Sequence, residues 1–200
     1  MLNKQLILLI LMVNFCLLSL AQPTLTSSSF NQNVGETFDV LDISFSSVSP
    51  GSSGANQTWD FSNGIELQSF SATMLDPAST PYGSSFPSAN ICQESGGSYA
   101  YYRHDNNAQQ IHGTFQSGVI IQYNNPEDYI RFPLNYTDSF TDYFEANYES
   151  GGVNFYRSGT STGTYDGYGT LIMPYGTFSN VIRVKLVEDY QDSSVLGITL

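Results

Sequence analysis

The chain has 200 residues and is acidic, with six Lys and Arg against 18 Asp and Glu and a formal net charge of −12. This charge argues against nucleic acid and anionic membrane surfaces as partners, because both are bound through basic patches. The aromatic content of 14% and the low overall charge of 12% do not fit a disordered chain. The length suits one folded domain or two small ones.

The first 21 residues have the pattern of a cleaved signal peptide. Lys4 supplies the positive charge, an apolar run begins at Leu6, and Ser19-Leu20-Ala21 provides the small residues that precede a cleavage site. The apolar run is too short to cross about 30 Å of hydrocarbon at about 1.5 Å per residue. We therefore expect a signal peptide at 1–21, a single β domain at 22–200, and secretion or display on the outer cell surface with no membrane span after cleavage.

Removal of the signal peptide would leave Cys92 as the one cysteine of the mature chain, because Cys16 leaves with the signal. An exported domain of this kind has no internal disulfide, so burial of side chains must supply its stability. The mature chain would carry five basic and 18 acidic residues, a formal net charge of −13.

Short alternating or apolar segments, separated by Gly, Asn, Asp, Ser and Pro, follow one another through the mature chain. No segment keeps a helical period for three turns, so the pattern predicts an all-β, antiparallel domain, either a β-sandwich or a curved open-barrel meander. A loop is expected at 47–57, and the connection at 76–90, with three prolines, is the longest. The expected strands are 37–45, 58–61, 65–75, 98–104, 110–115, 119–124, 128–133, 139–149, 153–165, 169–173 and 177–188.

The stretch 168–185 is the most regular part of the sequence and is predicted to be a structural hairpin. Phe178, Ile182, Val184 and Leu186 share one face at period two. In the turn we expect Pro174 at the second position of a type I turn and Gly176 in the left-handed conformation that closes a bulged hairpin. No side chain is left over for chemistry.

Cys92, His104 and His112 lie close together in the sequence and are the candidates for a Cys/His nucleophile pair or a metal site. A Cys/His pair needs contact in space and an orienting third group, and a metal needs a third convergent ligand. The Asp-Asn-Asn at 105–107 is a turn signal that separates the two histidines. We therefore predict no catalytic, cofactor-binding or metal site, and no cofactor.

Carboxylate pairs are present in the sequence as Glu145 with Glu149 and as Asp138 with Asp142. Glycoside hydrolysis needs two carboxyl groups at a fixed separation, but an acidic surface produces such pairs by accident. The segment 166–169 lacks the acidic repeats of a calcium loop. The chain is accordingly predicted not to be an enzyme.

Four of the five basic residues of the mature chain are arginines inside strand-like segments, at positions 103, 131, 157 and 183, with spacings of 28, 26 and 26 residues. They could lie on alternate strands of one sheet face, but chance and ordinary solvated arginines account for the pattern more simply. Trp59 is expected to be a buried structural residue. Tyrosines are expected at the margin of a Phe-rich core, although exposed ones could stack on sugar rings or on a partner.

Two segments resemble parts of a known group of proteins. "GSSGANQTWDFS" (51–62) and "DGYGTLIMPYGTFSNVIRVKLVEDYQDS" (166–193) are similar to segments of largely uncharacterised secreted proteins of Bacteroidota that carry a C-terminal type IX secretion sorting domain. The resemblance implies further strands and a sorting domain beyond residue 200, and it implies no catalytic residues.

The chain ends in "SSVLGITL" (193–200), which has the pattern of a strand. We expect the β domain to be truncated and to lack its last strands, with an exposed sheet edge or a poorly ordered tail at this end and a tendency to associate. The expected function is that of a secreted or cell-surface, non-catalytic β domain acting in adhesion, ligand binding or scaffolding, with a glycan as one candidate partner. The alternative is a carbohydrate-binding module or carbohydrate-active enzyme.

Overall fold

A computed structural model describes residues 22–30, 32–44 and 49–194 of the chain. The predicted signal peptide at 1–21 and the apolar segment 195–200 lie outside the described residues.

The described chain is all-β, and its ten strands form one mostly antiparallel open sheet that does not close into a barrel. The helical segments are short 3-10 turns, and none of those described is long and apolar enough to span a membrane. The strands are β1 (Thr37–Ser44), β2 (Gly54–Asp60), β3 (Ile65–Leu75), β4 (Ile91–Ser95), β5 (Ser98–His104), β6 (Ala108–Gln116), β7 (Val119–Arg131), β8 (Ser139–Ser150), β9 (Val153–Met173) and β10 (Gly176–Ser194); the 3-10 turns are η1 (Ser27–Phe30), η2 (Pro77–Ser79) and η3 (Gly83–Ser85).

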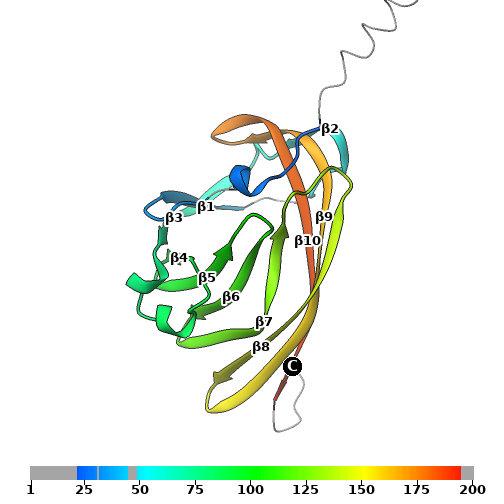
Figure 1. Cartoon of the computed structure of the whole chain (residues 1–200). Coiled ribbons are helices and arrows are strands. Elements are labelled where there is room, and N and C mark those ends of the chain that lie inside the picture. Colours follow the sequence, from blue (N-terminus) through cyan, green and yellow to red (C-terminus); the bar gives the residue numbers. More distant parts are fainter. Residues whose placement is uncertain (1–21, 31, 45–48, 195–200) are drawn as a thin grey trace, which may run out of the picture.

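The sheet is a meander in which each strand from β3 to β10 pairs with the next, and β1 joins it beside β3. Figure 1 shows the sheet curving from β1–β6 on one side, through β7, to the long β9–β10 hairpin on the other. The prediction of an antiparallel open meander is confirmed. The exception is β2, which pairs in parallel with β9 from residue 167 onward, beyond the end of the β8–β9 ladder at Thr164.

Small residues on β9 allow the sheet to curve tightly. A Cβ atom on Gly163 would lie 2.3 Å from the Phe140 ring of β8, and one on Gly159 would lie 2.5 Å from Cβ of Tyr190 on β10. Because neither glycine has a side chain, the Phe140 ring of β8 and the chain of β10 around Tyr190 lie directly on the β9 backbone. Register shifts in the β6–β7, β7–β8 and β9–β10 ladders add local twist, as bulges do.

Two clusters form the core. The first lies between the N-terminal segment and the sheet, and its buried members are Leu25, Ile130, Phe132, Leu134, Phe140 and Tyr165. The second lies under the proline-rich 76–90 connection, where Phe86 packs on Cys92 and Tyr101 and fills the space over Gly113. The long connection is therefore a packed cover over β4–β6.

The β9–β10 hairpin is present as predicted, but its turn differs. Gly176 pairs with Met173, so the turn contains two residues, Pro174 and Tyr175. Gly176 does not have a positive φ; the left-handed residue is Asn180, with φ of 59°. The prediction for Gly176 is thus wrong, because the extra residue of the hairpin lies within β10 and not at its turn.

The bulge at Asn180 also changes which side chains of β10 point inward. Ile182, Val184 and Leu186 pack on the first core cluster as predicted. Phe178 is 45% exposed, because the register shift between Phe178 and Val181 inserts one residue and moves Phe178 to the opposite face.

Other strand boundaries also depart from the prediction. The segments predicted at 119–124 and 128–133 belong to one strand, β7, and those at 153–165 and 169–173 belong to β9. The turn signals between them are accommodated as register shifts inside continuous strands. Strand β4 was not predicted, and β2 begins at Gly54, inside the expected loop.

Candidate functional site

The histidines and the cysteine do not form a joint site. Cys92 is fully buried, and burial raises the pKa of its thiol to about 11. His104 Nδ1 lies 3.2 Å from Oε1 of Gln109. His112 has a buried Nε2 without a hydrogen-bond partner, and desolvation lowers its pKa. Within the described residues, no group of three or more His, Cys, Asp or Glu side chains could hold a metal ion.

The predicted carboxylate pairs have separate local partners. Asp138 accepts hydrogen bonds from the backbone and side chain of Asn135, both at 2.9 Å. Asp142 binds Arg131 at 3.2 Å. Glu145 accepts a bond from the Tyr143 hydroxyl at 2.8 Å, and Glu149 is exposed. None of these interactions joins the members of a predicted pair.

Each of the four strand arginines forms an ion pair with aspartate. Arg157 binds Asp192 through two contacts of 2.7 Å, and Arg183 binds Asp166. Arg103 pairs with Asp105, and Arg131 pairs with both Asp128 and Asp142. Arg103, Arg131 and Arg157 lie on the alternate strands β5, β7 and β9, but Arg183 lies on β10, directly beside β9, so the alternation does not extend to the fourth arginine. Bidentate pairs of this kind fix side-chain geometry.

Trp59 connects the two segments on which the sequence resemblance rests. Its side chain is 4% exposed, its Nε1 donates to the Ser52 carbonyl at 3.0 Å, and the Arg183 guanidinium lies 5.1 Å from its ring centroid. A Cβ atom on Gly51 would approach the indole to 2.6 Å, and one on Gly167 to 2.9 Å. Gly51, Gly167 and Arg183 thus have a structural role around the indole, and the predicted burial of Trp59 is confirmed.

The most perturbed carboxyl group in the curved interior is Glu127 of β7, which the sequence did not single out. It is 3% exposed. Burial raises its pKa to about 7, and the negative charges of Glu188 and Asp142 act in the same direction. The neighbouring Ser161 hydroxyl and the Arg157 charge act in the opposite direction and offset part of the rise in this pKa. The contact with Ser161 does not have the geometry of a hydrogen bond, so Glu127 Oε1 and the Ser161 hydroxyl are both buried without a well-formed one. We call Glu127, Asp142, Ser161 and Glu188 the inner acidic cluster.

The register explains why these residues meet. Asp142 of β8 and Glu188 of β10 both lie opposite Ser161 of β9, forming one row across three strands. Glu127 belongs to β7, three strands away from Glu188. Their charges interact because the sheet curves and directs these side chains inward.

The inner acidic cluster has two features of an acid–base site, a carboxyl group with a pKa near neutrality and further carboxylates beside it. However, Glu127 Oε1 is covered, so a substrate could not contact it in this conformation. Asp142 is already occupied by Arg131 and by the backbone N–H of Asp128. Glu127 is therefore a buried structural carboxyl group with a raised pKa in the form described, whereas Glu188 of the same cluster is exposed.

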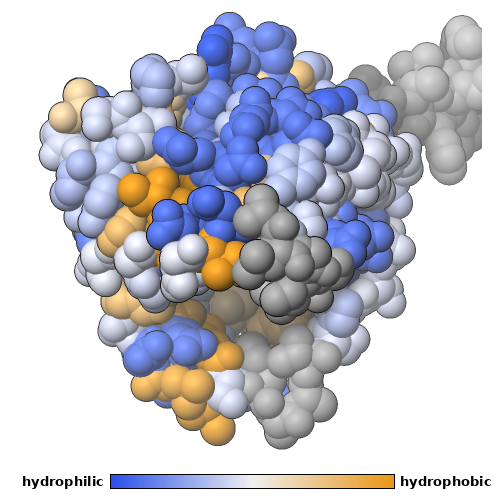
Figure 2. Space-filling view, turned by 90° about the horizontal axis from the view of Figure 1, so that it is seen from below, coloured by the Kyte–Doolittle hydropathy of each residue, from blue (hydrophilic) through white to orange (hydrophobic). Residues whose placement is uncertain are grey.

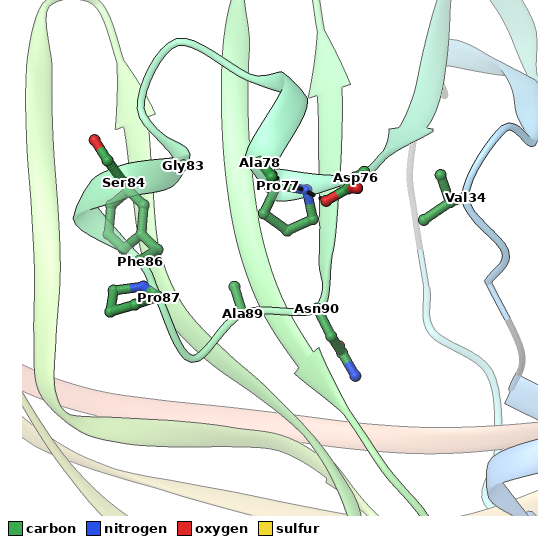
Figure 3. Close-up of a pocket in the computed structure, with 10 residues that line it drawn as sticks. All are labelled: Val34, Asp76, Pro77, Ala78, Gly83, Ser84, Phe86, Pro87, Ala89 and Asn90. Carbon is green, nitrogen blue, oxygen red and sulfur yellow. Dashed lines mark hydrogen bonds between the residues drawn. The ribbon is translucent and has the colours of Figure 1, made fainter.

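A surface pocket of about 710 Å³ lies beside the 76–90 connection (Figure 3). Figure 3 shows that proline, alanine and phenylalanine side chains form much of its lining. Its polar groups are used locally: Asp76 Oδ1 accepts a bond from Ala78 N at 2.9 Å, and Asn90 pairs with the backbone of His104. The pocket offers no convergent set of reactive groups.

The view from below shows several apolar patches separated by hydrophilic residues (Figure 2). The described residues on this face therefore do not form one continuous apolar surface.

Comparisons with known proteins add no family assignment: no protein-family model matches the chain, and searches of curated proteins and of solved structures give no match.

Proposed function

We propose that this chain is a secreted or cell-surface β domain that acts without catalysis, by binding an extracellular ligand or surface partner. The export pattern of its first 21 residues and its acidity support this location. The observation that carries the binding role is the distribution of its aromatic residues. Four tyrosines remain substantially exposed on the strands, namely Tyr129, Tyr143, Tyr156 and Tyr190, whereas the interior ionisable groups are paired or covered. Exposed tyrosines are typical of recognition surfaces.

A carbohydrate-active enzyme is the second candidate, and the inner acidic cluster is the observation that favours it. Glu127 has the raised pKa of a general acid. Catalysis would require the cluster to open, since Glu127 Oε1 is covered in the structure.

Two assays on the purified chain separate the candidates. A glycan array is expected to show binding, while a hydrolysis screen of the bound glycans is expected to show no turnover. Turnover that disappears in Glu127→Gln but persists in Glu149→Gln, a matched change at an exposed position of β8, would overturn the non-catalytic proposal.

A further inference from the structure

One group of surface side chains is well ordered by its neighbours but has no role in the packing of the fold. Along β8, Phe140, Phe144 and Ala146 are buried, while Tyr143 and Asn147, at alternate positions, are exposed. Tyr156 of β9 lies directly opposite Asn147. We call Tyr143, Glu145, Asn147 and Tyr156 the tyrosine platform; it lies on the outer face of β8 and β9, opposite to the inner acidic cluster.

The rings of the platform take part in no aromatic or cation–π contact within the described part of the chain and remain partly exposed. Tyr143 is 50% and Tyr156 39% exposed, and neither ring stacks on another aromatic ring or on a cation within the described residues. The other large exposed tyrosines do have such a partner: Tyr129, Tyr175 and Tyr190 lie against Tyr102, Phe178 and Phe144 respectively. The fold therefore leaves the two platform rings unused.

The two rings are nevertheless held in place, because their hydroxyl groups converge on one carboxylate. The Tyr143 hydroxyl donates to Glu145 Oε1 at 2.8 Å. Hydrogen bonds from Tyr156 and Tyr143 lower the pKa of Glu145, and the shared carboxylate raises that of Tyr156. Groups that are ordered before binding lose less conformational entropy when a ligand arrives.

The register also sets how the rings lie. Tyr156 is opposite Asn147, four residues along β8 from Tyr143, which is about 13 Å at about 3.3 Å per residue. Two phenol groups can meet over Glu145 across that distance only if both lie along the sheet. Both side chains keep a substantial part of their surface exposed in this arrangement.

The surroundings of the platform are rich in hydroxyls, and their charges are acidic: Glu145 belongs to the platform, Glu149 is exposed further along the same face of β8, and Asp189 of β10 lies opposite Thr160. Thr160 is opposite Tyr143 and Ser158 is opposite Glu145, and the hydroxyls of Thr141 and Thr162 are 3.2 Å apart. None of the residues named on this surface is basic, so it does not suit a polyanion. Tyrosine side chains that can pack on C–H groups, beside hydroxyls and carboxylate acceptors, suit a ligand that has no negative charge and is rich in hydroxyls.

We propose that the tyrosine platform binds a neutral polysaccharide chain that runs along β8 and β9, with sugar rings stacked on Tyr143 and Tyr156. This inference rests on the proposed binding function and specifies its surface and ligand class. The length between the two tyrosines explains why an extended chain, and not a single sugar, is the preferred occupant.

The test uses an array of neutral oligosaccharides of the cello-, xylo-, manno- and chito- series, followed by calorimetric titration with the best binder. Tyr143→Ala and Tyr156→Ala are each expected to weaken binding at least tenfold, while Tyr143→Phe, which keeps the ring, retains most of it. Tyr175→Ala is the matched control, since Tyr175 is exposed at the distant β9–β10 turn. This variant should bind the oligosaccharide as tightly as the unaltered chain does. Thermal unfolding of each variant checks that the fold is intact.

The outcomes separate the two proposals. If the unaltered chain binds an oligosaccharide and both alanine variants bind it equally well, the platform assignment is wrong while the binding function stands. If no neutral oligosaccharide binds, but the chain binds a protein partner and Tyr143→Ala abolishes that binding, the tyrosine platform is a binding surface and the assignment of a polysaccharide as its ligand is wrong. If the chain binds neither glycan nor protein, the proposed function itself fails.

Discussion

The buried carboxyl group of Glu127 provides the sharpest test of the energetics inferred for the curved interior. Replacement by glutamine keeps the size and shape of the side chain but removes its ability to ionise. In the folded chain the pKa of Glu127 is about 7, compared with an ordinary value of 4.5. Burial disfavours its charged form, and the negative charge of Glu188 adds to the effect.

The sign and size of the effect follow from proton linkage. Below pH 4.5 the carboxyl group is protonated in both folded and unfolded chains, so it contributes no pH dependence there. Between pH 4.5 and 7 the unfolded chain loses this proton first, and stability falls as the pH rises. A shift from 4.5 to about 7 corresponds to about 3 kcal/mol at about 1.36 kcal/mol per pH unit, and this cost is fully present above pH 7.

We therefore expect Glu127→Gln to be close to neutral at pH 4.5 and to stabilise the fold by up to about 3 kcal/mol at pH 8. Urea unfolding at pH 4.5, 5.5, 6.5 and 8 measures the difference, provided that the slope with denaturant is the same for both chains. Glu149→Gln makes the same change in net charge at an exposed position and should show little of this trend. A stability difference for Glu127→Gln that is constant from pH 4.5 to 8 would refute the raised pKa.

Three further predictions concern packing and reactivity. Trp59→Ala is expected to lower the free energy of unfolding by about 3–5 kcal/mol, measured by urea titration; unchanged stability together with loss of a ligand would instead make Trp59 a binding residue. Gly163→Ala places a methyl group 2.3 Å from the Phe140 ring and should cost about 1–3 kcal/mol, and a variant as stable as the unaltered chain would contradict the close packing on β9. The thiol of Cys92, fully buried and with a pKa of about 11, should react with a thiol reagent at pH 8 only when urea unfolds the chain; rapid reaction of the folded chain would show that the 76–90 cover opens.

The positions of most strands could be read from the sequence because alternation of apolar and polar side chains is a local property. The predictions for 65–75 and 98–104 match β3 and β5 residue for residue, and 139–149 agrees with β8 within one residue. Trp59 was correctly assigned to the interior. The failures occur at turn-like dipeptides such as Asn125-Pro126, where the sheet absorbs an irregularity without ending the strand.

The inner acidic cluster could not be found in this way. In the sequence Glu127 follows Asn-Asn-Pro and has the pattern of an exposed turn. Its burial depends on three facts of tertiary structure: β7 continues past Pro126, β9 carries small residues under the neighbouring rings, and the sheet curves enough for side chains of β7 and β10 to interact. The same holds for the tyrosine platform, whose members were visible as residues but not as neighbours.

The sequence by itself thus determined where strands form and which side chains alternate along them, since both depend on residues one or two positions apart. The tertiary structure decided which strands lie side by side, in which register, and how strongly the sheet bends. These properties depend on contacts between residues many positions apart in the chain, as with Glu127 and Glu188 or Gly163 and Phe140, and no local pattern encodes the partner of a strand or the pKa that a carboxyl group acquires when curvature buries it.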